Sequence, residues 1–172
     1  MEKMKPGTVY EIKLDIEKYV YVCRFNEFLL GLFDLVSEKQ IDIETVKGKK
    51  IIDYKDCSYI DKLNRFSKEK VKKNMWKKIG EIELVGNIIK IPDLAIYNPW
   101  KPELSHKNCE ILRYGHGTIK VTQEEYKKIL GTGLIYGCLD NFIIFERYIS
   151  RNIDNILSNK PMDPGGDVST FS

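Results

Sequence analysis

The side chains best suited to metal binding lie in the second half of the chain. His106, Cys109 and His116 are close together, and Cys138 follows further on. Imidazole nitrogen and thiolate sulfur are ligands that zinc takes in tetrahedral sites. The spacing matches no standard zinc motif, however, because the four cysteines are scattered and form no CxxC pair. We therefore expect no metal and no cofactor, and we interpret these residues as surface histidines and free thiols.

The same residues could form a nucleophile pair. A cysteine attacks a substrate as the thiolate, and a neighbouring histidine is a common base for it. No feature of the sequence places a cysteine at the start of a helix or beside such a base. A hydrolase or transferase with an unrecognised site around Cys109 and His116 is therefore our third hypothesis, behind two binding functions, and we expect no enzymatic activity.

Two further patterns have explanations simpler than catalysis. Glu81 and Glu83 lie two positions apart and would share one face of a strand, where paired carboxylates can exchange protons. Such residues more often face water. The glycines within 131–137 follow a predicted helix, whereas a phosphate-binding loop follows a strand and opens a helix. We interpret that segment as a connection between helices.

A basic run from Lys68 to Lys78 is the strongest local charge feature. Residues 67–78 read SKEKVKKNMWKK, so six lysines stand against one glutamate and surround Trp76. Lysines beside an aromatic ring can grip a phosphate backbone and stack a base. We interpret this run first as a solvated connection, second as a binding surface for an acidic protein, and third as a binding surface for nucleic acid. A nucleic-acid-binding module that uses this run is our alternative function.

The composition is that of an ordinary soluble globular protein. The chain has 172 residues, 42% hydrophobic and 31% charged, with a net charge of +3, which is too mild to argue for nucleic acid or membrane binding. No apolar run approaches the roughly 20 residues that span a bilayer, and the N-terminus has no signal-peptide core. We expect a cytoplasmic location and no membrane partner.

The elements that position these residues begin with three closely spaced strands, at 9–14, 19–25 and 28–36. The first two alternate in side-chain character, and the links between strands are short enough for hairpins. The third is almost continuously apolar, which is typical of a strand covered on both faces, and Gly31 within it suggests a bulge or bend. These strands predict an antiparallel meander that must curl or be covered to protect its edges.

Later segments add strands first and helices last. We expect strands at 50–54 and 76–84, a loop at 97–108, and a hairpin at 111–121 that turns at 115–117. Thr122 with Glu125 forms a capping box, which predicts a helix over 123–130, and apolar residues at helical spacing predict a second helix over 141–157.

We therefore predict an α+β protein with a curled, mostly antiparallel, barrel-like sheet followed by two C-terminal helices. The chain divides into a β-rich domain at 1–103, a β-hairpin and two-helix extension packed on it at 104–160, and a flexible tail at 161–172.

Residues 5–103 carry an ordered set of short motifs: a Pro6-Gly7 turn before a strand, a strand rich in tyrosine and valine, Phe33-Asp34, and a Trp…Ile-Gly…Leu pattern at 76–84. In this order the motifs resemble those of the immunity protein 26 family of bacterial polymorphic toxin systems. That family opens with a proline/glycine turn and a strand of the type GDVFEIPL, matched here by Pro6-Gly7 and the strand after it. A strand rich in tyrosine and valine follows, then one with an aromatic–Asp pair, here Phe33-Asp34. A later Trp…Ile-Gly…Leu pattern corresponds to 76–84. Thr8 and Lys13 depart from the family's acidic residue and proline.

The resemblance implies an antidote that binds a cognate toxin and blocks it, with no catalytic residues to carry over. The oligomeric state stays open. Docking of this kind uses aromatic anchors and a charged rim. Our candidate partner-binding residues are those that we expect to be exposed on the sheet and its loops: Glu11, Arg24, Asp34, Trp76, Glu81, Glu83 and Trp100.

Overall fold

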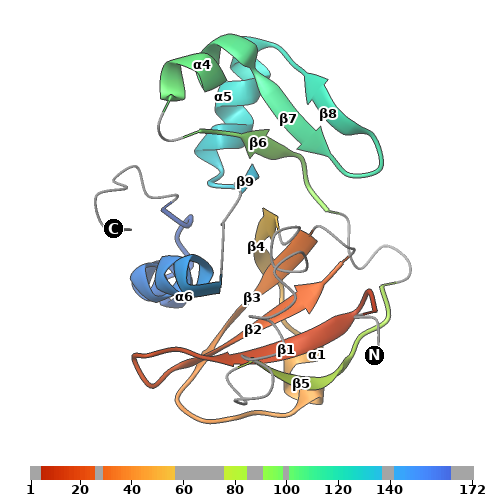
Figure 1. Cartoon of the computed structure of the whole chain (residues 1–172), viewed down its shortest axis with the longest axis vertical. Helices are drawn as coiled ribbons and strands as arrows, with labels where there is room; N and C mark the ends of the chain where they lie inside the picture. Colours follow the sequence, from red (N-terminus) through yellow and green to blue (C-terminus); the bar gives the residue numbers. More distant parts are fainter. Residues whose placement is uncertain are drawn as a thin grey trace.

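The computed structural model describes residues 5–25, 29–56, 76–84, 91–98, 101–136 and 142–163. Within these residues the chain forms two β-sheets and five helices, so the predicted α+β class is confirmed. In Figure 1 the second sheet lies above the first, with α4 and α5 beside it, and α6 lies beside the first sheet. The first sheet does not close into the barrel that we considered.

The first sheet has the strand order β4-β3-β2-β1-β5, and all of its neighbours are antiparallel. The predicted meander is confirmed, because β1, β2 and β3 are consecutive both in the chain and in the sheet. The register of β3 against β4 shifts between Leu32 and Phe33, next to the bend predicted at Gly31. The strands are β1 (Thr8–Lys13), β2 (Tyr19–Arg24), β3 (Leu29–Ser37), β4 (Ile51–Asp56) and β5 (Trp76–Glu81).

The second sheet has the order β8-β7-β6-β9 and contains one parallel pair, β6 with β9. The predicted hairpin is present as β7 and β8, with its turn at residues 114–116. Two short strands, β6 and β9, were not predicted. The strands are β6 (Leu94–Ile96), β7 (Glu110–Arg113), β8 (Gly117–Lys120) and β9 (Ile135–Tyr136).

The described helices follow the capping signals where these are strong. The Thr122 side chain accepts a hydrogen bond from the Glu125 N–H, which confirms the predicted start of α5. The second predicted helix is interrupted at Asn152, and a further helix lies in the segment that we predicted to be a loop. The helices are α1 (Ile43–Lys47), α4 (Pro102–Asn108), α5 (Gln123–Gly131), α6 (Phe142–Arg151) and α7 (Ile153–Leu157).

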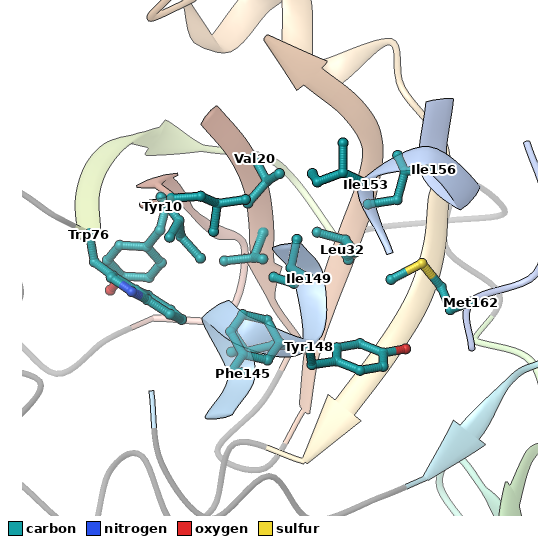
Figure 2. Packing of buried hydrophobic residues seen from close by; sticks show 14 residues of the cluster. Tyr10, Val20, Leu32, Trp76, Phe145, Tyr148, Ile149, Ile153, Ile156 and Met162 are labelled. Atoms are coloured by element: carbon teal, nitrogen blue, oxygen red, sulfur yellow. The ribbon is translucent and has the colours of Figure 1, made fainter. Parts of the chain in front are cut away.

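One face of the first sheet packs against the C-terminal helices. Tyr10, Trp76 and Phe145 bring their rings together there, with ring centroids 6.2 Å and 5.6 Å from that of Trp76 (Figure 2). Ile149 is fully buried against the same face. Residues far apart in the sequence thus form one core, since α6 and α7 bring the second half of the chain onto strands from the first.

The opposite face of the first sheet is covered as well. Val9, Tyr21 and Cys23 are fully buried in a second cluster, which α1 joins through Val46 and the second sheet joins through Leu94. A third cluster lies between the second sheet and α5, around Ile111 and Tyr126. Strands β1 and β2 are consequently buried on both faces, although their alternating sequence predicts one wet face.

The division of the chain at residue 103 stays a prediction. Strand β6 lies before that position and belongs to the sheet formed by later strands, whereas α6 lies after it and packs on the first sheet. The predicted tail at 161–172 is described only as far as Asp163, and Met162 is buried in the first core.

Candidate functional site

Three of the candidate partner-binding residues are buried, so our expectation that they are exposed is wrong. Glu11 is 2% exposed and accepts a hydrogen bond of 2.9 Å from the Tyr21 hydroxyl. Arg24 is 5% exposed. Trp76 is 4% exposed, and its indole N–H donates to Glu146 at 2.8 Å. The physical reason is common to all three, because the sheet that carries them is covered on both faces.

The other candidates do not form one site. Asp34 is half-buried on β3, whereas Glu81 ends β5, and two strands separate these elements in the sheet. Glu81 is exposed and pairs with Lys78 at 2.8 Å, and this contact lowers the pKa of the carboxyl. Glu83 is exposed. Trp100 lies outside the described residues, as does the basic run before Trp76.

The histidine and cysteine candidates lie at opposite ends of β7. Cys109, just before the strand, is 7% exposed, and its thiol donates to the His106 carbonyl at 3.0 Å. The His106 ring packs edge-on against Tyr126, with centroids 5.8 Å apart. His116 is exposed in the turn after the strand. Cys138 lies outside the described residues, and the described residues contain no cluster of metal ligands.

A buried polar network that the sequence analysis missed joins β4, α6 and β9. Asp53 and Lys55 lie two positions apart on β4 and form an ion pair of 2.8 Å, with side chains 1% and 7% exposed. Tyr148 on α6 donates its hydroxyl proton to the other carboxylate oxygen at 2.5 Å. The Lys55 ammonium also donates to the carbonyls of Tyr54 and Ile135, at 3.3 Å and 3.1 Å.

This network holds elements together rather than presenting a reactive group. The three N–H groups of Lys55 have three acceptors, and the Asp53 carboxylate also accepts the Tyr54 N–H at 2.8 Å. Burial, reinforced by the Asp53 charge, raises the pKa of Tyr148 well above its ordinary value of 10.0, so that its hydroxyl keeps the proton that it donates. Buried polar groups that are fully satisfied in this way specify how layers pack.

A groove of about 680 Å³ opens at one end of the second sheet. Three stretches of chain meet there: the residues before β6, the turn between β7 and β8, and the end of α5 with the residues that follow. Its lining combines aliphatic side chains with a few polar ones: Ile91, Pro92, Asp93, Arg113, Tyr114, His116, Ile129, Thr132 and Leu134. No single stretch of sequence signals such a site, because each contributes only a few residues.

An ion pair fixes the charged part of the groove. The Nε of Arg113 donates to Asp93 Oδ1 at 3.0 Å, and its Nη2 donates to Oδ2 at 2.7 Å. Glu125 on α5 also approaches this guanidinium, with its Oε1 3.9 Å from the same Nη2. The hydrogen bonds that Arg113 donates to Asp93 raise the pKa of Arg113. The guanidinium is thereby held in one orientation before any partner arrives, although it remains 41% exposed.

The turn between β7 and β8 carries an exposed aromatic ring to the rim of this groove. Tyr114 is 50% exposed, one of the large hydrophobic residues that the fold leaves in water. Gly115 and Gly117 have φ values of +81° and +75°, and the His116 N–H donates to the Arg113 carbonyl at 2.9 Å. Left-handed backbone at both glycines favours this tight turn. Tyr114 is therefore presented on a defined scaffold.

Comparison of the chain with family models, with curated proteins and with solved structures found no match. Among the helices that the structure describes, none has the length and apolar character needed to cross a membrane.

Proposed function

We propose that this chain is an immunity protein that binds a cognate bacterial toxin and neutralises it by protein–protein contact. On this proposal it acts in the cytoplasm, without catalysis and without a cofactor. The proposal joins two independent supports: the resemblance of residues 5–103 to the immunity protein 26 family, and the groove of the second sheet. The main observation for the groove is that the half-exposed Tyr114 lies on it together with Arg113, whose guanidinium donates two hydrogen bonds to Asp93.

The composition of this groove supports a role as a protein interface. Tyrosine and arginine are the residue types enriched among the few that dominate binding energy. Tyr114 offers a large ring with little conformational entropy to lose, because a tyrosine side chain rotates about only two χ angles. Arg113 offers a guanidinium whose orientation Asp93 has set in advance. Ile91, Ile129 and Leu134 supply the apolar surface on which a partner can exclude water.

The location of the groove also fits recognition. It lies where segments from three parts of the chain converge, and two of its aliphatic residues, Ile91 and Leu134, also pack against the core cluster on one face of the first sheet. Loop ends carried on a rigid scaffold are frequent sites of binding. The buried network of Asp53, Lys55 and Tyr148 also stabilises the chain beside the groove. Lys55 donates a hydrogen bond to the carbonyl of Ile135, which follows the groove residue Leu134.

The test is coexpression with the toxin domain encoded by the neighbouring reading frame. We expect the tagged chain to capture that toxin and to rescue cells that express it. Tyr114→Ala should weaken binding at least about tenfold, as expected for an anchor residue. Ile16→Ala is the matched control, since Ile16 is a similarly exposed apolar residue, 47% exposed, in the turn between β1 and β2.

The outcomes separate the parts of the proposal. Loss of binding for Tyr114→Ala with Ile16→Ala unchanged supports both the function and the groove. Full binding by both variants means that the toxin docks elsewhere. If the unaltered chain does not capture the toxin and does not rescue the cells, the proposed immunity function is refuted. Salt-sensitive binding to DNA or RNA in that case would favour the nucleic-acid alternative.

A further inference from the structure

The chain that follows α7 is tied back to the core by Asn152. This residue lies at the break between α6 and α7 and is 2% exposed. Its side-chain N–H donates to the Asp163 carbonyl at 3.0 Å, and its side-chain oxygen accepts the Asp163 N–H at 2.6 Å. The preceding residue, Met162, is 4% exposed and belongs to the core cluster that Figure 2 draws. Residues 158–163, which we call the strap, are therefore anchored by buried contacts.

The strap also lies against one wall of the groove. Gly133 separates the groove residues Thr132 and Leu134. A methyl group added at Gly133 would lie 3.0 Å from Cβ of Pro161 and 3.3 Å from the carbonyl oxygen of Met162, so the strap leaves no room for a side chain at this position. The strap thus contacts the chain between two lining residues, although it is not itself part of the groove lining.

A continuous line of contacts therefore runs from Asn152 to the groove. Asn152 bonds the end of the strap, and Pro161 and Met162 pack on Gly133. The wall at 132–134 connects the end of α5 to β9, a strand of two residues. A short connection of this kind has few contacts of its own and opens easily. Packing against the strap restricts where it can lie.

We infer that the strap holds the groove wall at 132–134 in the shape that binds the partner, and that a bound partner in turn holds the strap closed. This inference rests on the proposed function for the identity of the partner. The two effects are equal in free energy, because coupling between two sites is reciprocal. Asn152 is on this view a positioning residue, which acts on the groove through the strap.

The first test loosens the strap at its anchor and needs no toxin. Asn152→Ala removes the side-chain bonds to Asp163 and keeps the backbone bond from residue 152 to the Ile149 carbonyl. The amide of Gly133, which bonds the Leu130 carbonyl, should exchange its hydrogen at least about fivefold faster. Ile149→Val is the control, since it removes one methylene from the same core, and it should leave this amide at the parent rate. Unchanged exchange in Asn152→Ala, or equal acceleration in both variants, would overturn the inference.

The second test pushes on the strap from the groove side, and it also serves if Asn152→Ala does not fold. Gly133 and Gly115 have φ values of +75° and +81°, so alanine strains the backbone at both. Only at Gly133 would the methyl meet the strap, because Gly115 has no described atom within 4 Å. Hydrogen peroxide should oxidise the buried Met162 at least about threefold faster in Gly133→Ala than in Gly115→Ala. Equal rates in the two variants would show that the strap does not bear on this wall.

The toxin separates the inference from the proposed function. A toxin that binds should slow the oxidation of Met162 and should bind Asn152→Ala at least about fivefold more weakly than the parent chain. If the toxin binds Asn152→Ala and the parent chain equally and leaves Met162 oxidation unchanged, the inference fails while the function survives. If the toxin does not bind at all, the proposed function falls, and the two experiments without toxin still decide whether the strap holds the wall.

Discussion

Replacement of Lys55 by methionine is the sharpest test of how the two sheets are held together. Methionine keeps most of the length of the side chain and removes the ammonium. The variant leaves the Asp53 carboxylate, 1% exposed, without its Lys55 partner and removes the donor that Lys55 supplies to the carbonyls of Tyr54 and Ile135. Breaking a buried ion pair from one side costs about 3 to 5 kcal/mol, because an uncompensated charge stays in the interior.

That free energy is large enough to measure directly. In a chain of 172 residues each kcal/mol lowers the melting temperature by roughly 2 to 4 °C, so we expect a fall of about 6 to 20 °C. Urea unfolding followed by circular dichroism gives the same loss as a change in midpoint. Lys47→Met is the matched control, since Lys47 pairs with Glu44 at 2.6 Å on the surface, with side chains 43% and 73% exposed. It should cost no more than about 1 kcal/mol.

A double variant completes the argument. Lys55→Met combined with Asp53→Leu removes both charges, and it should be less destabilised than the sum of the two single variants by about 1 kcal/mol or more. Exchange of the Ala95 amide, which bonds the carbonyl of Leu134, should accelerate in Lys55→Met because β9 loses its tie to β4. If Lys55→Met costs no more than Lys47→Met, the buried network does not join the sheets and this reasoning is wrong.

Three further predictions follow from the core. Gly31→Ala should cost about 1 to 3 kcal/mol in urea unfolding, because the added methyl would collide with the Phe25 ring. An unchanged midpoint would contradict the packing of β3. Trp76→Phe should cost about 1.5 to 3 kcal/mol of stability, because the buried Glu146 carboxylate loses the indole donor. A loss below about 0.5 kcal/mol, which is the noise of such comparisons, would argue against that hydrogen bond. Burial raises the pKa of Tyr54 from 10.0 to about 12, so the stability that the protonated hydroxyl contributes is full below pH 10 and is lost as the pH rises through 12. Urea midpoints measured at increasing pH should therefore fall in this range. The fall should be smaller in Tyr54→Phe.

The elements that depend on neighbouring residues were predictable from the sequence. The hairpin turn at 114–116 needs left-handed backbone, which Gly115 supplies within the turn and Gly117 supplies at the start of β8. The start of α5 needs an acceptor for its first amides, and Thr122 supplies it. Alternation and short links predicted the meander of β1 to β3, since strands joined by tight turns pair with each other. These signals are local, so no knowledge of the rest of the chain is required.

The candidate site was not predictable in the same way. Asp53 and Lys55 alternate with apolar residues on β4, a pattern that predicts a wet face, and only α6 and β9 make that face an interior. Glu11 likewise becomes buried only because α1 and the second sheet cover its side of β1. The groove combines Asp93, Arg113 and Thr132 from three separate stretches. Sequence alone determined the meander of β1 to β3, the hairpin of β7 and β8 and the start of α5, because those features depend on side chains a few positions apart. Tertiary structure alone decided which faces are covered and which residues converge on the groove, because those choices depend on segments that meet only when the chain folds.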